Sequence, residues 1–221
     1  MPKAELNSEN LEALEKGLPN LLQHVDNVKN VYGLPCVVAI NAFPTDTKAE
    51  LDLVESKCRE LGVNVRLSEV WAKGGEGGLA LAEEVVRLCD EPNHFQFVYD
   101  VNDSIEDKLN AIATKVYHAD GVVIAASAKK QLKQLTELGF DKLPICMAKT
   151  QFSFSDDASK LGAPRGFKIT VRTSRSTGGG PVRASWSPKT GDIMTMPGLP
   201  KGPVRREDRR RTKTAKITGL F

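Results

Sequence analysis

Between residues 34 and 148, short apolar runs alternate with segments whose apolar residues recur at helical spacing, and this alternation constrains the fold more than any other feature. The runs are rich in Val and Ile and are bounded by Gly, Pro or polar residues, which is typical of strands buried in a parallel sheet. The chain therefore predicts a three-layer α/β architecture, with a mostly parallel sheet and helices on both faces. The predicted strands are Leu34–Ile40, Val63–Val70, Phe95–Tyr99, Gly121–Ala126 and Leu143–Ala148.

The predicted helices each carry one apolar face and have recognisable ends. The first spaces its leucines from Leu11 to Leu22, and the second has its apolar face between Leu51 and Leu61 and ends at Gly62. Further helices are predicted at Leu79–Leu88 and Lys129–Leu138. Capping residues are predicted for three helices: Asn7 or Ser8 for the first, Thr45, Asp46 or Thr47 for the second, and Ser104 with Asp107 for one that runs through Tyr117.

The character of the chain changes after about Lys149. Strand signals such as Phe167–Arg172 are there separated by stretches rich in Ser, Gly and Pro, and Thr173–Lys189 has little apolar periodicity. We therefore expect an α/β domain over residues 1–150 and a smaller, looser C-terminal lobe and tail over residues 151–221.

Several classes of protein are not favoured. No apolar run approaches the roughly 18 residues of a membrane span, and the N-terminal stretch has no apolar signal-peptide core, so a cytoplasmic location is expected. No zinc site or disulfide framework is predicted, because the cysteines form no C-x-x-C pair; we interpret them as reduced core thiols. The three histidines are scattered, so no metal site is predicted. The cysteines are Cys36, Cys58, Cys89 and Cys146.

A basic segment, Lys201–Lys216, has eight Lys and Arg against Glu207 and Asp208. Such a segment can bind nucleic acid through counterion release. The alternative is a solvated tail without a ligand, since no aromatic residue is interleaved for base stacking. Nucleic acid is therefore the less favoured partner.

Two loops of unusual composition follow predicted strands. Asn41–Thr47 presents Phe43, and Trp71–Gly78 presents an indole, one lysine and four glycines. Because ligands collect at the carboxyl ends of parallel strands, Phe43 and Trp71 are candidates to hold a flat heterocycle between them. Each ring alone is also explained as an ordinary core aromatic. The glycines permit close approach to an anion, but a simple turn explains them too, and their order is not that of a P-loop.

Five long strings, in the same order and over most of the chain, resemble formate-tetrahydrofolate ligase. They are VVAINAFPTDT (Val37–Thr47), VWAKGGEGG (Val70–Gly78), GFDKLPICMAKTQFSFSDD (Gly139–Asp157), GFKITVR (Gly166–Arg172) and TGDIMTMPGLPK (Thr190–Lys201). The resemblance implies a ligase that joins formate to tetrahydrofolate with ATP and Mg through formyl phosphate. It also implies a homotetramer and dependence on a monovalent cation.

The resemblance implies roles for particular residues. It places Phe43, Pro44, Leu67 and Trp71 in the folate pocket, within the 1–150 domain. The string LGAPRGF, residues 161–167, resembles the stretch that helps enclose the adenine, so the nucleotide candidates are Pro164, Arg165 and Gly166. Lys149 and Asp156 are candidate polar contacts, with surface or structural roles as the alternative. No catalytic residue and no metal ligand is assigned.

The chain departs from the family pattern in three places. It has no T-P-x-G-E-G-K-[ST]-T segment, so we expect it not to complete the reaction alone. One alternative is a non-catalytic folate-binding or subunit-interaction fragment that pairs with a separate P-loop polypeptide. Residues 173–189 do not match the family, and Gly202–Ala215 is basic where the family is acidic, before Lys216–Phe221 matches again. We interpret these mismatches as the result of compensating frameshifts in the gene. With suitable codons, Glu207–Arg210 would read one base later as Lys-Ile-Asp-Val, a string that resembles the tail of the family.

Overall fold

In the computed structural model, which describes residues 7–176 and 186–190, helices alternate with short strands that pair mostly in parallel. The α/β class is confirmed. Within these residues the strands form three small sheets instead of one continuous sheet, and each strand is only two to five residues long. The parallel pairs are β1 (Val37–Asn41) with β2 (Asn64–Ser68), β3 (Val122–Ile124) with β5 (Ile169–Val171), and β4 (Ala148–Lys149) with β7 (Trp186–Thr190); β6 (Thr173–Ser176) pairs antiparallel with β7.

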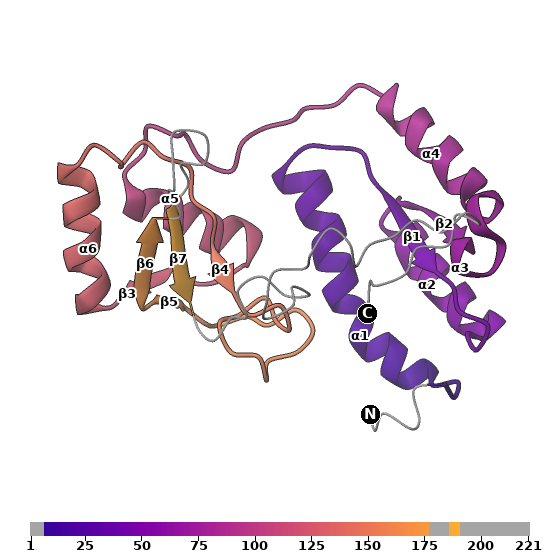
Figure 1. Cartoon of the computed structure of the whole chain (residues 1–221). Helices are drawn as coiled ribbons and strands as arrows, with labels where there is room; N and C mark the ends of the chain where they lie inside the picture. Colours follow the sequence, from indigo (N-terminus) through magenta and orange to yellow (C-terminus); the bar gives the residue numbers. More distant parts are fainter. Residues whose placement is uncertain (1–6, 177–185, 191–221) are drawn as a thin grey trace, which may run out of the picture.

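Figure 1 shows two groups of elements joined by a long connection, residues 90–104. The first group contains α1 (Leu11–Asp26), α2 (Lys48–Glu60), α3 (Val70–Lys73), the 3₁₀ turn η3 (Gly74–Gly78) and α4 (Leu79–Cys89), with β1 and β2. The second contains α5 (Ile105–Ala111), the π-helical turn η4 (Ile112–Val116), α6 (Ala126–Glu137) and the remaining strands. The groups meet where another π-helical turn, η2 (Asn27–Val31), contacts η4: Asn27 Nδ2 donates to the Val116 carbonyl at 2.9 Å.

The domain boundary predicted near residue 150 stays a prediction. The described strands on either side of it pair with each other, since β5 is bonded to β3 and β7 to β4. The basic segment Lys201–Lys216 and the string Gly202–Phe221 lie outside the described residues.

The first two helices begin at side-chain caps. Asn10 caps α1, because its Oδ1 accepts from the Ala13 N–H at 2.8 Å, so the prediction of Asn7 or Ser8 was wrong by two to three residues. Thr47, one of the three predicted candidates, caps α2, and it does so in a full capping box with Glu50 that was not predicted. The apolar faces of both helices cover β1 and β2 in one core. Its buried members are Val25, Val38, Cys58, Val63 and Val65.

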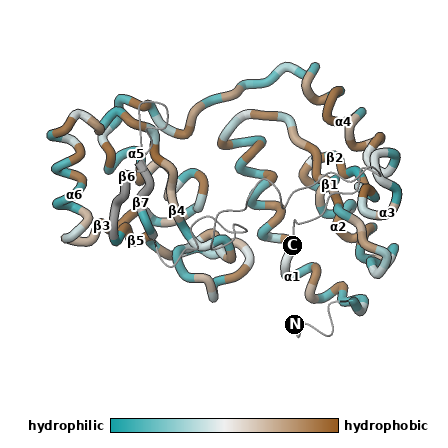
Figure 2. The backbone as a smooth tube through the Cα atoms, in the orientation of Figure 1, coloured by the Kyte–Doolittle hydropathy of each residue, from teal (hydrophilic) through white to brown (hydrophobic). Residues whose placement is uncertain are grey.

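The second group has its own core. Leu109 of α5 and Val171 of β5 are fully buried, with Leu132 of α6 packed in the same cluster. Along α6, teal and brown segments alternate in Figure 2, as expected for a helix with one buried face. Lys108 is also fully buried; its ammonium donates to the carbonyls of Asp141 and Leu143, at 2.6 and 3.3 Å, and burial lowers its pKa.

Three predicted elements were wrong in detail. Phe95–Tyr99 is not a strand; His94 N–H and Gln96 N–H instead donate singly to the carbonyls of Gly33 and Tyr32. The predicted strand Leu143–Ala148 shares only Ala148 with the observed β4, Ala148–Lys149. The loop Trp71–Gly78 is helical, because it folds as α3 followed by η3.

The interpretation of the cysteines as core thiols holds only in part. All four are unbonded to one another, and Cys58 is buried, but Cys89 and Cys146 are exposed. Within residues 7–176 and 186–190, no helix is long and apolar enough to cross a membrane.

Candidate functional site

The carboxyl ends of β1 and β2 form one edge. Ile40 pairs with Leu67 and Asn41 with Ser68, and the Ala42 N–H extends the ladder by donating to the Ser68 carbonyl at 3.0 Å. The loop that follows β1 and the turn that follows β2 therefore leave the sheet at the same edge. This edge carries all four residues that the resemblance places in the folate pocket.

A tight turn presents Phe43 at this edge. The Phe43 N–H donates to Asp46 Oδ2 at 2.9 Å, and the Asp46 N–H donates back to the Phe43 carbonyl at 3.0 Å. Pro44 lies inside this reciprocal turn, and its ring restricts the backbone there. The Phe43 side chain remains 46% exposed, so the turn holds an aromatic ring toward solvent.

The glycines after Trp71 serve the packing of their own turn. Gly74 ends α3 with φ +61°, a conformation that side chains disfavour. A Cβ on Gly77 would lie 2.5 Å from the backbone carbonyl of Glu69, whose N–H donates to the Gly77 carbonyl at 3.0 Å. A turn thus explains both glycines. This turn holds α3, which carries Trp71, against the end of β2.

Phe43 and Trp71 face each other across the edge. Their ring centroids are 6.3 Å apart and their planes are inclined by 48°. A flat ring held between two parallel rings needs roughly 7 Å between them, about twice one carbon–carbon contact distance. The observed spacing is slightly shorter than this, and Trp71 is 66% exposed. Leu67, 37% exposed, adds apolar surface beside them.

A buried carboxylate, which sequence reasoning missed, holds α4 against β2 behind this edge. Glu84 is 4% exposed; its carboxylate accepts from Arg87 at 2.7 Å, from Asn64 at 2.6 Å and from Arg66 at 3.0 Å. The hydrogen bonds from Arg87 and then Asn64 hold the pKa of Glu84 at about 2. The spacing of Glu84 and Arg87, three residues apart in a helix, indicates an ion pair within α4. The contacts of Glu84 with Asn64 and Arg66 of β2 could not be predicted in this way, because they depend on the fold.

Glu84→Gln is expected to lower stability at neutral pH. The ionised form stabilises the fold above the ordinary glutamate pKa, and this contribution is lost as pH falls toward 2, because the folded-state pKa is depressed. The difference in urea midpoint between wild type and Glu84→Gln should therefore be largest near pH 7 and shrink below about pH 4.5. Glu83→Gln, at an exposed neighbour, is the control. A difference that stays constant down to pH 3 would contradict this role.

The nucleotide candidates lie elsewhere, against α1. Arg165 donates to the Gln23 side chain at 2.6 Å and to the Pro164 carbonyl at 3.0 Å. Gly166 has φ +69°. The ring of His118 also contacts Gln23. Burial, together with the positive charge of Arg165, lowers the pKa of His118. Arg165 therefore already has a structural partner, and the structure does not bring it to the edge with Trp71.

Lys149 and Asp156 both have bonded partners within the chain. The Lys149 ammonium donates to the carbonyls of Thr150, Ser153 and Ser155, and burial lowers its pKa to about 8. Asp156 accepts from the Thr170 N–H at 2.9 Å. These contacts favour the structural alternative for both residues.

The described residues contain no group of three or more His, Cys, Asp or Glu able to hold a metal ion, so we assign no Mg²⁺ ligand among them. Parallel strand pairs, helices that connect them and an exposed aromatic pair at the carboxyl edge define an α/β protein with a candidate site for a flat heterocycle. The family profile of formate-tetrahydrofolate ligase matches residues 1–221. The chain belongs to that family.

Proposed function

We propose that this chain supplies the tetrahydrofolate site for ATP-dependent formation of 10-formyltetrahydrofolate from formate. The observation that carries the proposal is the exposed pair of Phe43 and Trp71, 6.3 Å apart at the edge where β1 and β2 end. The family match agrees with this assignment. Phe43, Pro44, Leu67 and Trp71 would bind the pterin ring by stacking and apolar contact, and would thereby orient the folate amine.

The reaction has two steps. ATP phosphorylates formate to formyl phosphate and releases ADP; the folate amine then attacks the formyl carbon, and phosphate leaves as the new C–N bond forms. The residues of this chain act in the second step, in which they hold the folate in place while its amine reacts. The 221 residues contain no P-loop sequence, so we propose that the ATP-binding segment comes from elsewhere, in a longer polypeptide or a partner. A homotetramer and a monovalent cation are further expectations from the family.

Calorimetric titration with tetrahydrofolate under reducing conditions tests the proposal. Trp71→Ala is expected to weaken binding about tenfold or more, because stacking on an aromatic side chain contributes about 1–3 kcal/mol. Trp71→Phe should restore part of the affinity, since it keeps a ring. Phe152→Ala, which removes another exposed aromatic ring outside this edge, is the matched control and should bind like wild type.

Equal affinity in wild type and Trp71→Ala would show that folate binds elsewhere or not at all. Absence of binding by a folded wild-type chain would overturn the proposal for the chain alone. Addition of a P-loop polypeptide, ATP and formate then distinguishes the alternative in which the site forms only in a complex, because formation of formyltetrahydrofolate can be followed directly.

A further inference from the structure

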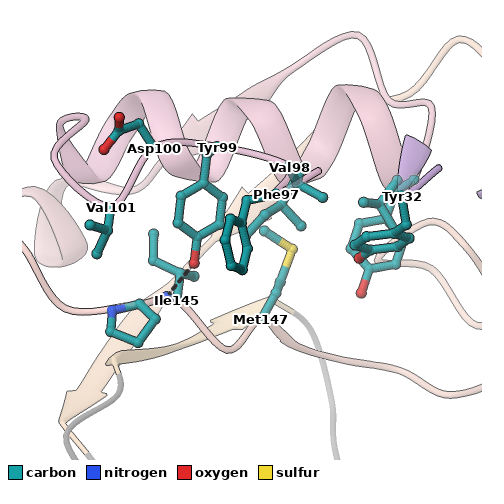
Figure 3. A pocket seen from close by; sticks show the side chains of 12 residues that line it. Tyr32, Phe97, Val98, Tyr99, Asp100, Val101, Ile145 and Met147 are labelled. Atoms are coloured by element: carbon teal, nitrogen blue, oxygen red, sulfur yellow. Dashed lines mark hydrogen bonds between the residues drawn. The ribbon is translucent and has the colours of Figure 1, made fainter. Parts of the chain in front are cut away.

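The two groups of elements meet beside a cavity of about 800 Å³. Tyr32, at the end of η2, lines it from one group, and Val116 and Tyr117, at the end of η4, line it from the other. Figure 3 shows Tyr32 at one end of this cavity, apart from Phe97 and Tyr99. Side chains that line a cavity make fewer apolar contacts than side chains in a packed core. Polar contacts therefore carry a larger share of the junction between η2 and η4.

A chain of hydrogen bonds, which we call the Gln23 latch, crosses this junction. Gln23 of α1 is 5% exposed. Its Oε1 accepts from the Arg165 guanidinium at 2.6 Å, and its Nε2 lies 2.5 Å from His118 Nε2. The same Nε2 donates to Asn27 Oδ1 at 3.4 Å, next to the bond from Asn27 to the Val116 carbonyl. The latch thus ties α1 to the end of η4 and to the segment 161–166.

The order of donors and acceptors in the Gln23 latch is fixed. A guanidinium only donates, so the Gln23 atom that meets Arg165 must be the carbonyl oxygen. The amide nitrogen of Gln23, which only donates, therefore faces His118. His118 Nε2 must accept, so the ring is neutral and carries its proton on Nδ1. Because a protonated histidine has no acceptor, the latch holds only while His118 is neutral.

The surroundings of His118 supply a second partner for its charged form. Two charged groups act on the ring, Arg165 and Asp26. Asp26 Oδ2 is 3.9 Å from His118 Nε2, and Asp26 lies about one helical turn beyond Gln23 on α1. Burial and Arg165 lower the pKa of His118, and Asp26 acts in the opposite direction. The His118 side chain is 28% exposed, so a proton can reach the ring from solvent.

We infer that the Gln23 latch is an acid-sensitive switch at the junction of the two groups of elements. When His118 takes up a proton, its Nε2 no longer accepts from Gln23 and turns to Asp26. The positive charges of His118 and Arg165 then repel each other. The link from Gln23 to the end of η4 is lost, and the junction opens more often. This inference uses no residue of the edge with Phe43 and Trp71, so it does not rest on the folate proposal.

The pH dependence of the latch has a definite sign. The pKa of His118 in the folded chain lies below the ordinary histidine value of about 6.5. As pH falls, the unfolded chain therefore takes up this proton before the folded chain does. The contribution of the latch to stability is present above about pH 6.5 and is lost as pH falls toward the folded-state pKa.

NMR titration of the histidine Cε1–H signals tests the order of donors and acceptors. The chain has three histidines, and His118→Asn identifies the signal of His118. Its pKa is expected below 6.5. Gln23→Glu keeps the length of the side chain but replaces the amide nitrogen by an acceptor oxygen, so it should move the His118 pKa above 6.5. Asp26→Asn should move the His118 pKa further down, because it removes the partner of the charged form.

Hydrogen exchange measures the opening of the junction. The N–H groups of Tyr117 and Ala119 are bonded to carbonyls of η4 and report on its end. After correction for the intrinsic effect of pH on exchange, opening should rise about threefold or more from pH 7 to pH 5. His118 has φ +56°, which asparagine tolerates, so His118→Asn should keep the backbone and remove this rise. His94→Asn, at an exposed histidine, is the matched control and should keep the rise.

Three results would overturn the inference: a His118 pKa at or above 6.5 in wild type, a His118 pKa that Gln23→Glu leaves unchanged, or a rise in exchange that persists in His118→Asn. Should Gln23→Glu fail to fold, Asp26→Asn decides in its place, because its side chain is 42% exposed and its loss should leave the fold intact. A His118 pKa that does not fall in Asp26→Asn would overturn the switch to Asp26.

Discussion

Gly33→Ala is expected to destabilise the chain by about 3 kcal/mol or more. Gly33 has φ +69°, and this left-handed conformation alone costs a residue with a Cβ roughly 1–2 kcal/mol. The new Cβ would also lie 2.2 Å from the carbonyl oxygen of His94. Because the Gly33 carbonyl accepts from the His94 N–H, the clash cannot be relieved without separating two bonded segments. Equilibrium urea unfolding followed by circular dichroism measures the loss.

Gly166→Ala is the matched control. Gly166 has the same φ of +69°, but a Cβ there meets nothing within 4 Å. It should therefore show the backbone cost alone, about 1–2 kcal/mol. If the two variants lose equal stability, the close approach of residue 94 to residue 33 is not as the structure has it.

Leu109→Ala is expected to lose about 3 kcal/mol of unfolding free energy, within the usual range of about 2–5 kcal/mol for a buried leucine. Leu109 is fully buried in the core that α5 shares with α6 and β5. Removal of its isobutyl group leaves a cavity in the core between α5, α6 and β5. Guanidinium unfolding followed by circular dichroism gives the difference.

Leu138→Ala makes the same chemical change at the end of α6, where the side chain is 68% exposed. Its effect should stay within about 0.5 kcal/mol. A Leu109→Ala variant as stable as Leu138→Ala would mean that the second group is not packed around Leu109 of α5.

Local features of the fold followed from the amino-acid sequence. The α/β class, a cap for α2 among residues 45–47 and the positions of β1, β2 and α4 rest on periodicity and on contacts between near neighbours, so they were predictable. Sequence also placed Phe43 and Trp71 after neighbouring strands. Because parallel strands end at a common edge, this was enough to bring the two rings together.

Tertiary structure decided what depends on partners distant in sequence. Phe95–Tyr99 has a strand-like composition, yet it forms no strand, because its hydrogen-bonding partners include Tyr32 and Ile145 and not a neighbouring strand. Arg165 contacts Gln23, 142 residues away, which no local pattern indicates. Sequence by itself determined the class of fold and one edge with two aromatic rings. Only long-range packing set the contacts of Glu84 with β2 and the contact of Arg165 with Gln23, since each requires side chains that meet through the fold.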